Sequence, residues 1–271
     1  MGANKGFNVN SFLQAFQQGW VTSATQWHNS LFSSNTSDHS RGGEHPYSEP
    51  SFHNDHPRVP AFCGACAACL ELSPARRGAS NVTVLAVELM STTVRLLRRN
   101  FERFGVPGQV IHGAASSEEG TVQMRVAPPG EEGLGLDVKR GWAWRLGGTE
   151  TVRKTTVDAL TREATIGKVD LLSIDAEGHD DEVLRGAEET LNRTTIVEFE
   201  YHFVGLWATR PLSATIARLE ALRFQCFWQG NSGRLAHANA DECLVSLSER
   251  FWSNLVCTRE PKVLRIFEAF A

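Results

Sequence analysis

The chain has 271 residues, of which 41% are hydrophobic and 21% are charged, and its formal net charge is −4 at pH 7. This length is enough for one large α/β domain with its own core, while the weak negative charge excludes the basic surface by which proteins bind nucleic acid. No apolar run approaches the roughly 20 residues that span a bilayer, and the first residues lack the layout of a signal peptide, so we expect a cytoplasmic protein without a membrane span.

The N-terminus carries a glycine-rich turn, in which Gly2 and Gly6 flank Ala3-Asn4-Lys5. Glycines in such a turn let the backbone approach a ligand closely. Residues 7–20 follow with apolar side chains at helical spacing. A turn of this kind connects a strand to a helix, yet only Met1 precedes it.

Residues 21–80 read as an insertion, because Ser, His, Asn and Pro replace most apolar residues over much of this stretch. Cys63, Cys66 and Cys69 lie near its end. Thiolates at this spacing could bind a structural metal ion, but they could equally be reduced thiols or form a disulfide in an oxidising compartment. Six cysteines in a chain of this length do not form a disulfide framework, and we predict no metal in the catalytic site.

Strands and helices alternate from residue 82 onward. The predicted strands cover 82–88, 109–115, 121–126, 151–157, 169–174, 195–201, 224–228 and 251–257, and the predicted helices cover 94–104, 181–191 and 211–222. This alternation predicts an α/β fold with a doubly wound, Rossmann-like, mostly parallel sheet. The last two strands have no strong helix between them, so we expect an antiparallel edge.

An acidic cluster follows the predicted strand 169–174. Asp175, Glu177 and Asp180 come directly after this buried strand, where ligands of such sheets bind. So much negative charge at one sheet edge lowers stability unless it has a partner. Capping of the next helix is the alternative explanation, and it suits Asp180 better than Asp175.

Two other strands also end in polar residues. Glu88 ends the strand 82–88, where a carboxylate commonly accepts hydrogen bonds from the ribose hydroxyls of an adenosine cofactor. Glu200 and His202 lie at the carboxyl end of the strand 195–201. Both are candidates for the same site, although a lone histidine there can also be structural.

Six segments taken together resemble the FkbM family of S-adenosylmethionine-dependent methyltransferases. They are MGANKGF, VLAVEL, VIHGAASSEEGTVQMRV, TTVDAL, VDLLSIDAEGHDDEVLRGAEETL and TTIVEFEYH. The resemblance covers roughly residues 1–20 and 81–202, and IDAEGHDDEVLRGA is its most specific part.

The resemblance implies a class I methyltransferase fold with S-adenosylmethionine as cofactor. It also implies that a hydroxyl, often on a sugar or small natural product, accepts the methyl group, so that the partner is a small molecule or glycan. The cofactor-binding residues implied are Gly2, Asn4, Gly6, Glu88, Ala115 and Asp175. The resemblance brings Asp175 and Glu177 to the methyl-transfer centre, and our candidates for the catalytic base are Asp175, Glu177 and His202.

The family pattern has a strand before the glycine turn, so we expect residues 1–271 to form a single methyltransferase domain truncated at its first strand. Two other functions stay open. A degenerate methyltransferase domain could serve as a binding module, with the cysteine-containing insertion as its interaction element. A nicotinamide-dependent oxidoreductase is disfavoured, because the turn is G-x-x-x-G rather than G-x-G-x-x-G.

Overall fold

The computed structural model describes residues 82–126, 148–202, 204–230, 234–239 and 253–271, together with the single residues Leu13 and Gln26. Several predicted site residues lie outside this part of the chain. They are Gly2, Asn4 and Gly6 of the glycine turn and Cys63, Cys66 and Cys69 of the insertion.

The described residues alternate strands with helices. In chain order the elements are β1 (Val84–Glu88), α3 (Ser91–Phe104), β2 (Gly108–His112), β3 (Ala114–Ala115), β4 (Gly120–Arg125), β5 (Thr149–Thr155), α4 (Val157–Glu163), β6 (Val169–Ile174), α5 (Asp180–Arg185), α6 (Glu188–Leu191), β7 (Thr194–Tyr201), η2 (Gly205–Ala208), α7 (Leu212–Ala221), β8 (Gln225–Gln229), β9 (Leu235–Ala238), β10 (Ser253–Thr258) and α8 (Pro261–Glu268). The predicted mixed α/β class is confirmed.

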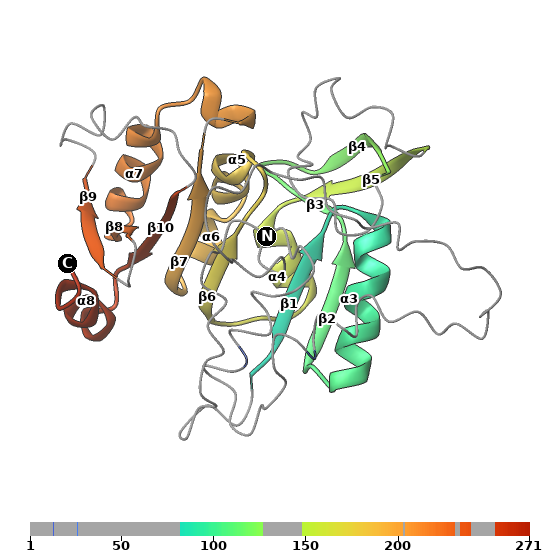
Figure 1. The fold of residues 1–271 in the computed structure, drawn as a ribbon, viewed down its shortest axis with the longest axis horizontal. Helices are drawn as coiled ribbons and strands as arrows, with labels where there is room; N and C mark the ends of the chain where they lie inside the picture. The colour runs from blue at the N-terminus through green and yellow to red at the C-terminus, as the bar shows by residue number, and fades with distance from the viewer. Residues whose placement is uncertain are drawn as a thin grey trace, which may run out of the picture.

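The strands form three sheets, ordered β1-β2, β3-β5-β4 and β6-β7-β10-β8-β9 (Figure 1). β1 and β2 are parallel, as are β6 and β7, whereas β10 runs antiparallel to both β7 and β8. The predicted antiparallel edge is therefore confirmed. Among the described residues no strand joins β1 to β6, so these sheets stay separate and a single doubly wound sheet remains a prediction.

Helix α3 packs beside the β1-β2 pair (Figure 1). Val94, Leu97 and Phe101 recur at helical spacing and are all buried, and burying such side chains is the main force that holds a helix on its sheet. The helix ends at Gly105, as predicted. Leu13, which is helical and fully buried, belongs to the same apolar cluster, in agreement with the predicted helix over residues 7–20.

The larger core surrounds β6 and β7. Leu172, Ile174, Val197 and Phe199 are almost fully buried there. β6 begins and ends at the predicted residues, and its apolar residues Leu172 and Ile174 are buried. Trp207 from η2 packs against this core and stacks 6.3 Å from Phe199, measured between ring centroids.

The predicted helix 181–191 is divided into α5 and α6 at Gly186. A Cβ atom at this position would lie 1.9 Å from the carbonyl oxygen of Ser116, so the backbone there packs directly on the segment after β3. The sequence prediction also missed α4, β9 and α8. α4 is too short to show a clear apolar period, whereas Val263, Leu264 and Phe267 of α8 have helical spacing that the prediction overlooked.

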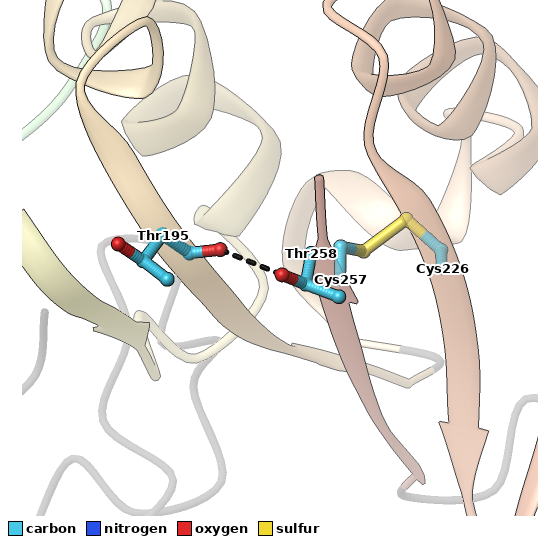
Figure 2. The surroundings of a disulfide bond; sticks show 4 residues. All are labelled: Thr195, Cys226, Cys257 and Thr258. Carbon is cyan, nitrogen blue, oxygen red and sulfur yellow. Dashed lines mark hydrogen bonds between the residues drawn. A yellow bond between two sulfur atoms is a disulfide. The ribbon is translucent and has the colours of Figure 1, made fainter. Parts of the chain in front are cut away.

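A disulfide bond links Cys226 on β8 to Cys257 on β10 (Figure 2). The two residues are directly opposite each other in the antiparallel register, and both are buried. On the other side of β10, the hydroxyl of Thr258 donates a hydrogen bond of 2.9 Å to the carbonyl oxygen of Thr195. The sequence does not predict the Cys226–Cys257 disulfide bond, because a separation of 31 residues carries no pairing signal.

Candidate functional site

Two turns meet at the carboxyl ends of β6 and β7. Gly178 lies in the turn after β6 with φ of 91°, and a Cβ atom there would lie 2.4 Å from the carbonyl oxygen of Val204. The backbone N–H of Leu206 donates to the carbonyl oxygen of Gly178 at 3.0 Å. Only glycine allows this approach, and the contact holds the turn after β6 against the turn after β7.

Asp180 ties both strands to these turns from inside the protein. Its fully buried carboxylate accepts hydrogen bonds from the backbone N–H groups of Ala176, Gly178 and Glu200, at 3.4, 3.2 and 3.4 Å. Burial raises the pKa of Asp180, and the charge of Glu200 adds to this effect. Asp180 is therefore a structural clamp at the site, rather than a group that can reach a substrate.

Asp175 is the most perturbed carboxyl group of the site. Burial, and then the charges of Glu200, Glu177 and Asp180, raise the pKa of Asp175 to about 8. All four carboxyl groups come from the ends of β6 and β7 or from the turn between β6 and α5. The register pairs Ile174 with Phe199, so Asp175 and Glu200 are the next positions on the two strands. The raised pKa favours the protonated form of Asp175 at neutral pH when no ligand is bound, and the coupled carboxyl groups around it share this proton.

Glu177, Glu200 and His202 come together beside Asp175, with one possible ligand atom from each lying within 4.8 Å of the others. A carboxylate–histidine group of this kind could hold a metal ion. The arrangement of His202 does not favour this, however. Its Nδ1 accepts a hydrogen bond of 3.0 Å from the backbone N–H of Val204, so the proton of the neutral ring is on Nε2, and that nitrogen has no lone pair for a metal.

Asp181, the residue after Asp180, has a very different environment. Burial alone would raise its pKa, but hydrogen bonds from Thr215, Arg185 and Arg218 hold the pKa of Asp181 well below its usual range. Arg210 also donates to it at 2.9 Å. These contacts fasten α5 to α7, so Asp181 is a structural ion-pair centre.

The predicted cofactor residues Glu88 and Ala115 lie at the ends of β1 and β3. Both are buried, and Oε1 of Glu88 accepts a hydrogen bond of 2.8 Å from the backbone N–H of Met90. Figure 1 shows β1, β6 and β7 running in the same direction, so Glu88 is on the same side of the molecule as Asp175. The structure thus brings the predicted residues Asp175, Glu177, Glu200 and His202 together, while Glu88 and Ala115 lie at the ends of strands in the other two sheets.

A mixed α/β fold with polar residues after its parallel strands defines a class of ligand-binding enzymes. Residues 63–226, more than half of the chain, match the model of the methyltransferase FkbM domain. The chain therefore belongs to the FkbM family of methyltransferases. No curated protein and no solved structure matches the chain. Within the described residues, no helix is both long and apolar enough to cross a membrane.

Proposed function

We propose that this protein transfers the methyl group of S-adenosylmethionine to a hydroxyl of a sugar or small natural product. Membership of the FkbM family supports methyl transfer. One observation carries the assignment of the cofactor: burial of Asp175, together with the charges of Glu200, Glu177 and Asp180, raises its pKa to about 8. A cation bound beside Asp175 would relieve this excess of negative charge.

S-adenosylmethionine supplies that cation, because its sulfonium is both the positive charge and the activated methyl group. The oxidised nicotinamide ring is also a cation, so the family match rather than charge favours S-adenosylmethionine over a nicotinamide dinucleotide. The enzyme's remaining task is to align the hydroxyl with the methyl carbon and to accept the hydroxyl's proton.

In this proposal the cofactor extends from the end of β6 to the end of β1. Asp175 and Glu177 face the methyl-transfer centre, Glu88 holds the ribose, and Ala115 lies near the adenine. The glycine turn, with Gly2, Asn4 and Gly6, lines the methionine part. Residues 1–271 act as one methyltransferase domain with a doubly wound sheet, in which a further strand between β1 and β6 would join the two sheets.

The test is a calorimetric titration of S-adenosylmethionine into the protein, with NAD as the negative control. We expect saturable binding of S-adenosylmethionine alone. Glu88→Ala should weaken it by roughly 1–3 kcal/mol, through the loss of charged hydrogen bonds. Glu88→Gln is the matched control, since its amide oxygen can still accept the hydrogen bond from Met90. Binding of NAD, or no binding of S-adenosylmethionine, would overturn the proposal.

A degenerate, non-catalytic binding module is the second candidate. It rests on the order of the sheets in the described part of the chain, where no strand pairs with both β1 and β6. The same titration separates the two functions, since a module without a cofactor site would fold normally and yet bind no S-adenosylmethionine.

A further inference from the structure

Four groups near the methyl-transfer centre could take the proton of the acceptor hydroxyl: Asp175, Glu177, Glu200 and His202. The hydrogen bonding of His202 excludes its own ring and points to the carboxylate next to it. The His202 side chain is 0% exposed and its Nδ1 is already an acceptor for the Val204 N–H. The Nε2–H of the neutral ring lies 3.3 Å from Oε2 of Glu200. Neither ring nitrogen is left to accept a proton from a substrate.

Asp175 does not suit this role either. Its raised pKa favours the protonated form at neutral pH when no ligand is bound, and the positive charge of S-adenosylmethionine would draw that proton off, leaving Asp175 as the counter-ion of the cofactor. Glu200 stands one position beyond the Ile174–Phe199 pair, beside Asp175, with 10% of its side chain exposed. β7 is paired on both sides, by β6 and β10, so the backbone of Glu200 is fixed.

We propose that Glu200 accepts the proton of the acceptor hydroxyl and that His202 is the positioning residue that orients its carboxylate. This inference rests on the proposed function. As the hydroxyl oxygen bonds to the methyl carbon, the carbon–sulfur bond breaks and its electron pair stays on sulfur. The hydroxyl proton passes to Glu200, so a sulfonium and a carboxylate become a neutral thioether and a neutral carboxylic acid. The contact with the Nε2–H of His202 tightens into a hydrogen bond when the substrate is bound, as catalytic contacts commonly do.

Two amide variants of His202 separate its two contacts. In His202→Asn the side-chain amide reaches only as far as Nδ1, so it can accept from Val204 but offers nothing to Glu200. In His202→Gln the amide N–H can occupy the place of Nε2–H. Within the described ranges, the titratable groups near Glu200 are Asp175 and Glu177 from the β6–α5 turn, Asp180 from the start of α5 and His202 from the end of its own strand. All but His202 stay unchanged in both variants.

The first measurement is the nitrogen-15 spectrum of the histidine rings in the full chain. His202 is assigned by comparison with His202→Gln, and the chain has nine histidines. We expect Nδ1 without a proton and Nε2 with one, and a shift of the Nε2 signal in Glu200→Gln. A proton on Nδ1, or a signal that Glu200→Gln leaves in place, would overturn the contact between the two residues.

The second measurement follows O-methyl products from carbon-13-methyl S-adenosylmethionine and a mixture of hexoses. Glu200→Gln should lower kcat by about 10²-fold or more, a larger factor than the change in its affinity for S-adenosylmethionine. His202→Asn should lower kcat by about 10-fold or more and move the acid limb of the pH–rate profile upward, because a carboxylate without its N–H neighbour binds a proton more tightly. His202→Gln should recover most of this loss, and His237→Gln on the exposed strand β9 is the control that should change nothing.

The two hypotheses fail in different ways. Wild-type protein that forms no O-methyl product would overturn the proposed O-methylation, while the ring spectrum would still decide the contact of His202 with Glu200. Active wild-type protein with an equally active Glu200→Gln variant would overturn the role of Glu200 alone. Equal losses in His202→Asn and His202→Gln, without a change of the pH profile, would make His202 purely structural.

Discussion

Replacing Asp175 with asparagine should stabilise the folded protein, and the gain should grow with pH. The folded state raises the pKa of this carboxyl from 3.8 to about 8, chiefly through burial. A group whose pKa is raised on folding contributes stability that is fully present below its unfolded pKa and is lost as the pH rises through its folded pKa. The relevant window therefore runs from about pH 4 to about pH 8.

The magnitude follows from the width of this window. Each pKa unit corresponds to about 1.4 kcal/mol, so between pH 5 and pH 8 the wild type would lose about 4 kcal/mol relative to an uncharged side chain. We expect a difference of only ~2 kcal/mol. Glu200, Glu177 and Asp180 share the protons of the cluster, so Asp175 titrates over a broader pH range than an isolated carboxyl group.

The assay is urea unfolding of wild type and Asp175→Asn at several values between pH 5 and pH 8, followed by tryptophan fluorescence. Asp181→Asn is the control, because we expect it to change the free energy of unfolding in the opposite direction. Its carboxyl has a lowered pKa, so it contributes stability that is present above the unfolded pKa and lost only as the pH falls through the folded one. That variant should be destabilised by a constant amount across the whole range. A constant difference for Asp175→Asn, or a loss of stability at pH 8, would refute the reasoning.

Three further predictions concern the cofactor, the turn and the disulfide bond. The affinity for S-adenosylmethionine should rise by up to about tenfold per pH unit as the pH rises toward 8, since Asp175 must lose its proton to pair with the cation. Calorimetry on Asp175→Asn should show a weaker pH dependence of the affinity, and equal slopes for both proteins would contradict this pairing. In Gly178→Ala the new Cβ would lie 2.4 Å from the Val204 carbonyl oxygen. This variant should therefore have an unfolding free energy lower by about 2 kcal/mol or more and should not bind S-adenosylmethionine. An unchanged midpoint of urea unfolding would refute the close contact. Reduction of Cys226–Cys257 should cost about 4 kcal/mol for a loop of 31 residues. Urea unfolding with and without dithiothreitol would measure this cost, and identical curves would show that the bond does not form in solution.

The sequence was sufficient to predict the strands that carry the site. β6 and β7 are short apolar runs that end in charged residues, and both lie within one residue of the predicted bounds. Their carboxyl ends had to lie together because parallel strands meet at one sheet edge. The sequence also marked Asp175, Glu177, Glu200 and His202, because polar residues directly after buried strands have few other reasons to be there.

Other features depended on contacts between distant segments. The approach of Gly178 to Val204 and the tautomer of His202 both arise from the turn after β7, which has no pattern of its own. The break at Gly186 depends on a carbonyl some seventy residues earlier in the chain. Periodicity can report which face of an element is buried, but it carries no information on which backbone will pack against it.

The contrast between Asp175 and Asp181 is the strongest physical argument for a cationic ligand. The two carboxyl groups belong to the same turn and helix, yet Asp181 is compensated by Arg185, Arg210 and Arg218. Among the described residues, no arginine or lysine forms an ion pair with Asp175, although the same fold supplies three of them to its neighbour. Without a compensating positive charge, the ionised carboxylate of Asp175 lowers the stability of the ligand-free protein. In the proposed function, the sulfonium of S-adenosylmethionine would supply the positive charge that no arginine or lysine of the described residues gives to Asp175.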